Sequence, residues 1–480
     1  MNRDLLERLS KDELIALMVA QESRHAAEIA MLTARLAELE RRLGLNSGNS
    51  GKPPSSDGLK KPPRTQSQRE ASGKKPGGQT GHPGETLRQV AEPDSTVDHY
   101  PAACATCGSA LTAAMATDYS ARQVFDLPEP QPLRVTEHRA HNCRCANCGT
   151  PTRASFPEGV AAPVQYGQRL CAVVVYLMHY QFVPEARLVE LMSDLFQVPL
   201  AGASIARMSR NCAARLEGFA AAVCARVCAA AVKHMDETGF RIGGKTQWLH
   251  IASTALLTFY RVSARRGSLL VGVIGIIVHD HWKPYYTLKG VLHALCNAHH
   301  LRELQALIEI EKEDWARKMQ RLLRRACHAA NLARARGVPL KPRLIERFER
   351  CYAAILADGF AFHEAQPPLA AATVAGAPKR RGRPRRRTGH NLLRRLDSRK
   401  EDVLRFLSNP VVPFTNNQAE RDGRMMKLRQ KISGGFRTEL GAADFAVIRS
   451  FISTAKKHGW NVIQALSQNP QALINSLRSA

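Results

Sequence analysis

The sequence lacks any long hydrophobic run. Its longest apolar stretch, residues 269–278, is interrupted by glycine and has the length of a strand, whereas a membrane-spanning helix needs about 20 consecutive apolar residues. The first residues, MNRDLLERLSKDEL, include acidic side chains where a signal peptide would have an unbroken apolar core. Both absences argue against a membrane or secreted protein, and we expect an intracellular one.

Acidic residues are scarce relative to basic ones. The 480 residues include 69 lysines and arginines against 42 aspartates and glutamates, which gives a formal net charge of +27. This surplus favours binding to a polyanion, because each neutralised phosphate releases counterions, and nucleic acid is the commonest such partner. An anionic membrane surface is the alternative. The length alone predicts about two to four domains.

Four of the twelve cysteines form two short pairs, Cys104 with Cys107 and Cys145 with Cys148, each followed by a glycine. Thiolates three positions apart can bind one tetrahedral ion while the glycine allows a tight turn, so the pairs predict a four-cysteine zinc site. The 37 residues between the pairs exceed the usual spacing of roughly 15 to 20. Cys143 is a substitute ligand, and buried or redox-active cysteines are the alternative.

The first 44 residues predict a long helix. Their apolar residues repeat at steps of three and four, the seam of a short coiled coil. The seam consists of Ile29, Leu32, Leu36, Leu39 and Leu43. One amphipathic helix packed on its own domain is the alternative. Residues 45–98, rich in Pro, Gly, Ser and Lys, predict a disordered basic linker.

Residues 160–228 have a helical apolar pattern with a break at Gln197–Gly202, after which a new helix can begin at Ser204. Two helices joined by a short turn, the second carrying spaced basic residues, form the arrangement of a helix-turn-helix DNA-binding domain. An ordinary helical hairpin fits the same pattern equally well, so both interpretations stay open.

After Val232 the apolar periodicity becomes that of strands, with a Gly243–Gly244 turn between the first two. The four predicted strands cover residues 234–242, 247–253, 257–263 and 274–280. Asp236 lies within the first strand and Asp280 ends the fourth. Helices dominate the following sequence, which predicts a helical insertion over about 305–410 before the last helices.

Glu420 lies at the start of a helix that is otherwise basic. Asn417, three residues earlier, predicts a capping box in which both side chains bond backbone N–H groups. A helical wheel puts three basic residues on the Glu420 face and three apolar residues on the adjoining face, which we expect to be buried. These residues are Arg424, Lys427 and Lys431, and Met425, Leu428 and Ile432, respectively.

Carboxylates from two strands and a later helix can converge on one edge of a sheet. There Asp236, Asp280 and Glu420 would supply hard oxygen ligands for two Mg²⁺ ions about 3.5 to 4 Å apart, an arrangement that serves phosphoryl transfer. Each acid also has an ordinary explanation. Asp236 could be a surface charge on an edge strand, Asp280 a turn or helix cap, and Glu420 the capping-box partner.

Two smaller features add candidate DNA contacts. Seven of the nine residues of KRRGRPRRR, residues 379–387, are basic. Its core resembles an AT-hook, whose arginines, here Arg381 and Arg383, enter the minor groove of A·T-rich DNA; we favour a solvated linker that contacts phosphates alone. Arg421 is a candidate phosphate contact, with surface solvation as the alternative.

A group of metal-ligand residue types lies on the segment after the fourth strand. It consists of Cys296, His299, His300 and Glu303. One interpretation is a further metal site on a helix. The interpretation that we favour is packing beside the active site, with these side chains supporting its ligands.

Four blocks occur in a fixed order: DET at 236–238, VHDHWKPYY at 278–286, CNAHHLRE at 296–303 and TNNQAERDGR at 415–424. Together they resemble the signature blocks of the IS66-family transposases, which are of the DDE type. The resemblance extends to both cysteine pairs, the linker NSGNSGKPPSSDG and the leucine-rich N-terminus, so it covers nearly the whole chain. Cys143 and the basic residues after Pro378 depart from the family's pattern.

The resemblance implies an RNase H-like α/β core with a mixed sheet over residues 229–440, between a zinc-binding segment at 99–155 and a helical region at 441–480. Asp236, Asp280 and Glu420 would be the metal ligands of this core, for two Mg²⁺ or Mn²⁺ ions. Cys104, Cys107, Cys145 and Cys148 would hold one structural Zn²⁺.

The activity implied by the resemblance is transposition of an insertion sequence. The enzyme would bind the terminal inverted repeats, cleave the element ends by metal-assisted hydrolysis, and join each 3′-OH to target DNA without a covalent enzyme intermediate. Expected partners are double-stranded DNA, a second copy through the coiled coil, and helper proteins of the same element, in the nucleoid of a bacterial cytoplasm. A non-catalytic zinc-containing DNA-binding regulator and an RNase H-like nuclease are the alternatives.

Overall fold

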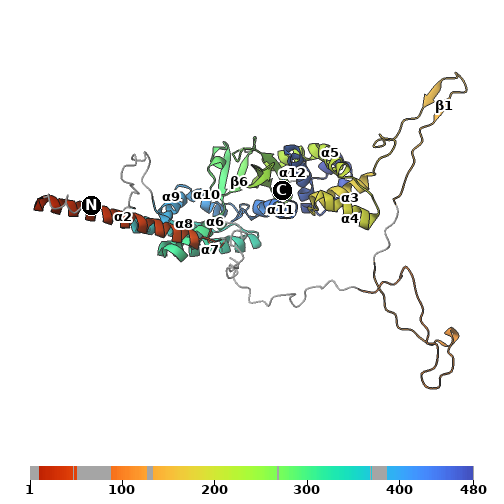
Figure 1. Cartoon of the computed structure of the whole chain (residues 1–480), viewed down its shortest axis with the longest axis horizontal. Helices are drawn as coiled ribbons and strands as arrows, with labels where there is room; N and C mark the ends of the chain where they lie inside the picture. The colour runs from red at the N-terminus through yellow and green to blue at the C-terminus, as the bar shows by residue number, and fades with distance from the viewer. Residues whose placement is uncertain are drawn as a thin grey trace.

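The computed structural model describes residues 10–46, 48–50, 88–126, 133–267, 270–367, 369 and 386–478. Its centre is a mixed sheet covered by helices, from which one long helix and the cysteine-bearing segments project (Figure 1). Most of the predicted linker, residues 51–87, lies outside the described residues, as do Arg381 and Arg383. Among the described residues no helix is both long and apolar enough to cross a membrane.

The sheet has five strands in the order β5-β4-β3-β6-β7. They are β3 (Val232–Ile242), β4 (Lys245–Ser253), β5 (Thr258–Ser263), β6 (Gly275–His279) and β7 (Val291–Leu295). The first three pair antiparallel, whereas β6 and β7 run parallel to β3. The four predicted strands are present. The prediction missed β7, because this short apolar run leads within two residues into a helix and could not be told from that helix by its periodicity.

Six helices pack around one end of the sheet. They are α3 (Gln168–His179), α4 (Glu185–Phe196), α5 (Gly202–Ala229), α12 (Glu439–Lys457), α13 (Val462–Leu466) and α14 (Pro470–Asn475). Buried residues of α5 such as Phe219 share one core with Met235 of β3 and Phe451 of α12. The boundaries expected at 228 and 440 therefore do not separate independent hydrophobic cores.

The insertion forms a second helical layer against the β7 edge of the sheet. It contains α6 (Asn297–Ala306), the π-helical turn η4 (Leu307–Glu311), α7 (Asp314–Ala335), α8 (Pro342–Glu364), α9 (Thr388–Ser398) and α10 (Lys400–Ser408). Trp315, Tyr352 and Leu393 pack in its centre, in a core that continues to Val278 and Leu295 of the sheet. The insertion is thus continuous with the strands that carry the candidate site.

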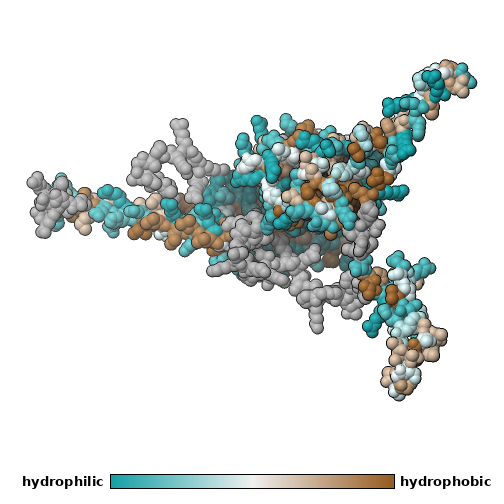
Figure 2. Space-filling view, turned by 45° about the vertical axis from the view of Figure 1, so that its right-hand side comes forward, coloured by the Kyte–Doolittle hydropathy of each residue, from teal (hydrophilic) through white to brown (hydrophobic). Residues whose placement is uncertain are grey.

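The N-terminal helix α2 (Lys11–Gly44) begins with a capping box, in which Ser10 and Glu13 bond each other's backbone N–H groups. Leu32 and Leu36 of the predicted seam are 55% and 58% exposed, and brown patches run along this helix in Figure 2. Just beyond its C-terminal end, Asn49 Nδ2 donates to Glu309 Oε2 at 2.9 Å. The C-terminal end of α2 is therefore attached to the insertion at η4, and the apolar seam of the helix is exposed.

Candidate active site

Strand register brings two of the predicted acids side by side. The pairing of β3 with β6 ends with His234 opposite Val278. Two residues further along each chain come Asp236 and Asp280, which are near enough for the charge of Asp280 to raise the pKa of Asp236. Asp280 directly follows β6, and its Oδ1 accepts a hydrogen bond from the backbone N–H of Trp282 at 2.9 Å. The chain therefore turns away from the sheet immediately after this carboxylate.

Glu420 reaches the site from α11 (Asn417–Ser433), which packs across β3 and β4. The helix approaches the strands closely because its buried face carries small residues, Ala419 and Gly423; a Cβ on Gly423 would lie 2.7 Å from Ile251 Cδ1. The predicted buried face is wrong for Leu428 and Ile432, which are 51% and 43% exposed, whereas Met425 is partly buried against the core as expected. The face that meets the sheet therefore combines two small residues in its first half with the fully buried Met426 further along.

The predicted capping box at the start of α11 is also wrong. The N-cap is Asn416, and no side chain caps the helix. Instead Asn416 Nδ2 donates to the carbonyl of Met235 at 2.7 Å, and its Oδ1 lies 2.9 Å from His234 Nδ1. In a capping box the glutamate carboxylate accepts the backbone N–H of the N-cap residue. Here the Asn416 backbone N–H donates to Cys296 Sγ at 3.1 Å instead, so the Glu420 carboxylate is free to face the site.

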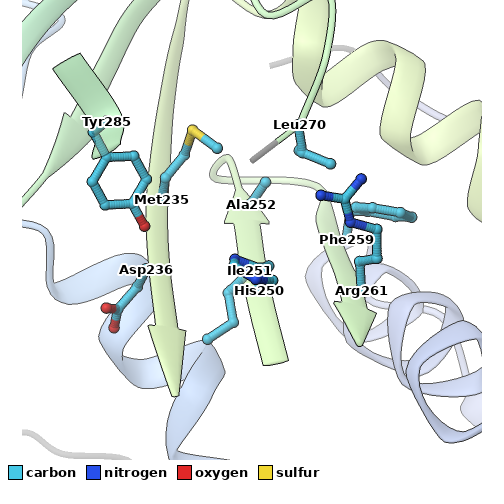
Figure 3. A pocket seen from close by; sticks show the side chains of 9 residues that line it. All are labelled: Met235, Asp236, His250, Ile251, Ala252, Phe259, Arg261, Leu270 and Tyr285. Atoms are coloured by element: carbon cyan, nitrogen blue, oxygen red, sulfur yellow. The ribbon is translucent and has the colours of Figure 1, made fainter. Parts of the chain in front are cut away.

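The acids interact electrostatically. Burial and then the nearby charges of Glu237, Glu420 and Asp280 raise the pKa of Asp236 to about 8. Glu237 accepts a hydrogen bond from the Tyr285 hydroxyl at 2.6 Å and forms an ion pair with Arg266 at 2.6 Å. Figure 3 shows the Tyr285 hydroxyl directed toward Met235 and Asp236. Crowded carboxylates that cannot all ionise are typical of a site for cations.

Side chains from α6 surround Glu420. Cys296, the N-cap of α6, donates its S–H to Glu420 Oε1 at 3.7 Å, while His299 Nδ1 and Arg302 Nη2 lie 3.8 and 3.9 Å from the same oxygen. Burial and then Glu420 raise the pKa of Cys296 to about 12. Among the described residues, Cys296, His299 and Glu420 are the one set of three metal-ligand atoms within 4.8 Å of one another.

Models of known protein families match long parts of the chain. Residues 163–444, more than half of the chain, match the model of the Transposase IS66 family. The chain belongs to this family. Residues 101–149 match the zinc-finger binding domain of transposase IS66, and residues 4–88 match a family of unknown function.

A curated relative gives a shorter match. The uncharacterized protein y4jO of Sinorhizobium fredii is 35% identical over 77 residues, which are 15% of this chain and 24% of that relative. The chain therefore spans about a quarter of the length of the relative that it matches.

Within the IS66 zinc-finger match, the two cysteine pairs have the same local structure. The Gly108 and Gly149 N–H groups donate to the carbonyls of Cys104 and Cys145, both at 2.9 Å, and both glycines have a positive φ. Hydrogen bonds lower the pKa of the Cys107 thiol to about 7, and the bond with the Ser109 side chain has the greatest effect. The two pairs thus form the same tight turn, and they stand on separate arms (Figure 1).

The basic residues of α11 that were expected to bind DNA are all exposed. They are Arg421, Arg424, Lys427 and Lys431. Lys427 also donates to the carbonyl of Gly239 at 2.7 Å, and partial burial lowers its pKa. All four predicted residues on this helix are therefore presented to solvent.

Sequence reasoning missed several contributors to the site. It did not name Glu237, Arg266 or Tyr285, whose side chains meet in one hydrogen-bonded group beside Asp236. Two of them lie inside the quoted signature blocks, so the blocks were a usable signal. His300 and Glu303 turn away from Glu420, toward His281 and Arg395 respectively.

Proposed function

We propose that this chain is the DDE transposase of an insertion sequence, which binds the terminal inverted repeats, cleaves the element ends and joins each 3′-OH to target DNA. The observation that carries the proposal is the meeting of Asp236, Asp280 and Glu420 within a chain of the IS66 family. The mixed sheet, with three antiparallel strands followed by two parallel ones, supports an RNase H-like core.

The three carboxylates would hold two Mg²⁺ or Mn²⁺ ions. Such ions, when bound, polarise the scissile phosphate and stabilise the attacking and leaving oxygens. The chain's own part is positioning: Trp282 orients Asp280, β3 buries Asp236, and Asn416 ties α11 to β3. The exposed Arg421, Arg424 and Lys431 would neutralise backbone phosphates near the cut.

Other regions would supply recognition and assembly. The turn from α4 to α5 passes through Gln197 in the left-handed conformation, and Arg207 and Arg210 are exposed near the start of α5, which supports DNA binding by this helix pair. The exposed seam of α2 would pair with a second copy of the chain. Cys104, Cys107, Cys145 and Cys148 would join their two arms around one Zn²⁺, which would order this segment.

The test uses the full chain and DNA carrying the element's ends, with Mg²⁺. Asp236→Asn, Asp280→Asn and Glu420→Gln should each reduce end cleavage roughly 100-fold or more while DNA affinity is retained. Glu346→Gln, an exposed acid on α8, is the matched control. Undiminished cleavage in all three variants would remove the catalytic assignment. Cutting of branched DNA without preference for ends would indicate a junction resolvase.

The zinc assignment has its own test. Cys104→Ser combined with Cys145→Ser should lose about one equivalent of zinc per chain by elemental analysis, whereas Cys351→Ser, at an exposed cysteine on α8, should lose none. Full retention of zinc in the double variant contradicts the four-cysteine site.

A further inference from the structure

We propose that Cys296, His299 and Glu420 form a second metal site, selective for a thiophilic divalent ion such as Zn²⁺. Because Glu420 belongs to both sites, the ion bound here competes with the Mg²⁺ site for this carboxylate. Binding of the ion stands on the geometry alone. Its inhibitory consequence rests on the proposed transposase function.

The three ligand atoms already approach tetrahedral spacing. Glu420 Oε1 lies 3.7 Å from Cys296 Sγ and 3.8 Å from His299 Nδ1, and all three atoms are within 4.8 Å. With a zinc–sulfur bond of about 2.3 Å and zinc–nitrogen or zinc–oxygen bonds of about 2.0 to 2.2 Å, the edges of the tetrahedron are roughly 3.3 to 3.6 Å. Both distances from Glu420 Oε1 need to shorten by only a few tenths of an ångström, and the third edge, between Cys296 Sγ and His299 Nδ1, lies within 4.8 Å.

The His299 nitrogen that faces Glu420 lacks a hydrogen-bond partner. Nδ1 is buried, and no donor or acceptor in the described part of the chain satisfies it. Buried polar atoms are rarely left in this state, and a neutral imidazole nitrogen is a common metal ligand. A cation between His299, Cys296 and Glu420 would satisfy this atom.

Burial and the charge of Glu420 raise the pKa of the metal-free Cys296 thiol, but two features would stabilise its thiolate once an ion replaces the proton. The sulfur accepts the backbone N–H of Asn416 at 3.1 Å and lies at the N-terminus of the ten-residue helix α6, where the helix dipole favours negative charge. On binding, the S–H proton leaves to solvent and a sulfur–metal bond takes its place. Arg302, 3.9 Å from Glu420 Oε1, balances this carboxylate when no ion is bound.

The ligand types determine the ion. Mg²⁺ takes oxygen ligands in octahedral geometry, whereas one sulfur, one nitrogen and one oxygen with an open fourth position match zinc. An ion held at this site would engage Glu420 on its α6 side and withdraw it from Asp236 and Asp280. Free zinc would thereby lower the rate of Mg²⁺-dependent cleavage.

Cobalt provides a direct probe in the full chain. Titration of the wild type with Co²⁺ should fill the cysteine pairs and this site, about two equivalents in all, with the visible absorption of tetrahedral cobalt. Cys296→Ser and His299→Ala should each lose about one equivalent or bind it at least tenfold more weakly. Cys327→Ser, at a half-buried cysteine on α7, is the control and should match the wild type.

Two outcomes separate this proposal from the proposed function. Equal cobalt uptake with unchanged spectra in the wild type, Cys296→Ser and His299→Ala overturns the second site, even if end cleavage is normal. Loss of an equivalent in both variants supports it, even if no cleavage is found. If Cys296→Ser does not fold, as judged by circular dichroism, His299→Ala decides alone. Zinc inhibition, relative to each variant's own rate in Mg²⁺, should weaken at least tenfold in His299→Ala.

Discussion

The side-chain amide of Asn416 donates to the backbone carbonyl of Met235 at 2.7 Å. Met235 immediately precedes Asp236, and Asn416 immediately precedes the helix that carries Glu420. One hydrogen bond thus links the strand of one acid to the helix of another. Asn416 is 2% exposed, so water does not readily replace this bond.

Asn416→Ala should therefore destabilise the fold and loosen the site together. The variant leaves the Met235 carbonyl and His234 without their partner, which costs about 1 to 3 kcal/mol, and it frees the first turn of α11 to shift. We expect cleavage to fall by roughly tenfold or more, as measured beside denaturant unfolding. Asn475→Ala, at an exposed position on α14, should change neither.

Gly423→Ala tests the close approach of α11 to the sheet. The added methyl group would meet Ile251 Cδ1 at 2.7 Å. The clash should cost about 1 to 3 kcal/mol and outweigh the gain of up to about 1 kcal/mol in helix propensity. Ile251→Val removes the clashing carbon, so the double variant should recover much of the stability and cleavage lost in Gly423→Ala. If Gly423→Ala alone matches the wild type in both assays, the helix does not depend on this contact.

Asp236→Asn should stabilise the metal-free protein while abolishing cleavage. Burial and neighbouring carboxylates raise the pKa of Asp236 to about 8, above its value in the unfolded chain. The unfolded chain therefore ionises first, and the free energy of unfolding falls as pH rises from about 4 to 8. At pH 7 in a chelator, the variant should gain about 1 to 3 kcal/mol, a shift of a few degrees in Tm. Adding Mg²⁺ should raise the Tm of the wild type alone. A lower Tm for the variant in chelator would contradict this account.

Buried histidine should make the fold sensitive to acid. His179 is buried, lies 2.6 Å from Ser209 Oγ, and its pKa is lowered to about 3, first by burial and then by Arg429 and Arg449. Since the unfolded chain takes up a proton below about pH 6.5, the free energy of unfolding falls by about 1.4 kcal/mol per pH unit for such a group. Its contribution is present above that pH and is lost as pH falls.

The measurement for His179 is denaturant unfolding at pH 7 and pH 5. His179→Gln should reduce the loss of stability between these two values by about 2 kcal/mol. His328→Gln, at an exposed position on α7, should show the same loss as the wild type. An unchanged pH dependence in His179→Gln would mean that the pKa of this imidazole is not lowered in the folded state.

The sequence predicted the parts of the fold that depend on local periodicity. Alternation of apolar and polar residues located four strands, and the positions of Asp236 and Asp280 within them indicated that both acids could reach one edge of a sheet. β7 was missed because it leads almost directly into α6, so its apolar residues fitted the helical pattern as well. Asn417 matched a capping box by spacing alone, whereas the side chain of the observed N-cap, Asn416, has its partners on β3, which no local pattern reveals.

Packing of α11 could not be predicted from its helical wheel for a related reason. The wheel identifies where large apolar residues gather, but the face that meets the sheet consists of Ala419, Gly423 and Met426, and two of these three are small. Likewise, Cys296 and His299 were grouped with His300 and Glu303 by sequence spacing. Only the folded chain brings Glu420 to two of them and turns the other two away.

The contact between the C-terminal end of α2 and the insertion has a geometric consequence for how two chains would pair. A helix of 34 residues is about 50 Å long, and its C-terminal end is held next to Glu309. If two chains join along the exposed leucines, each insertion stands at one end of a stiff rod. Parallel pairing would set the two catalytic sheets next to each other, and antiparallel pairing would hold them a helix length apart. Helix direction in that pairing would therefore decide how far apart two bound DNA ends are held.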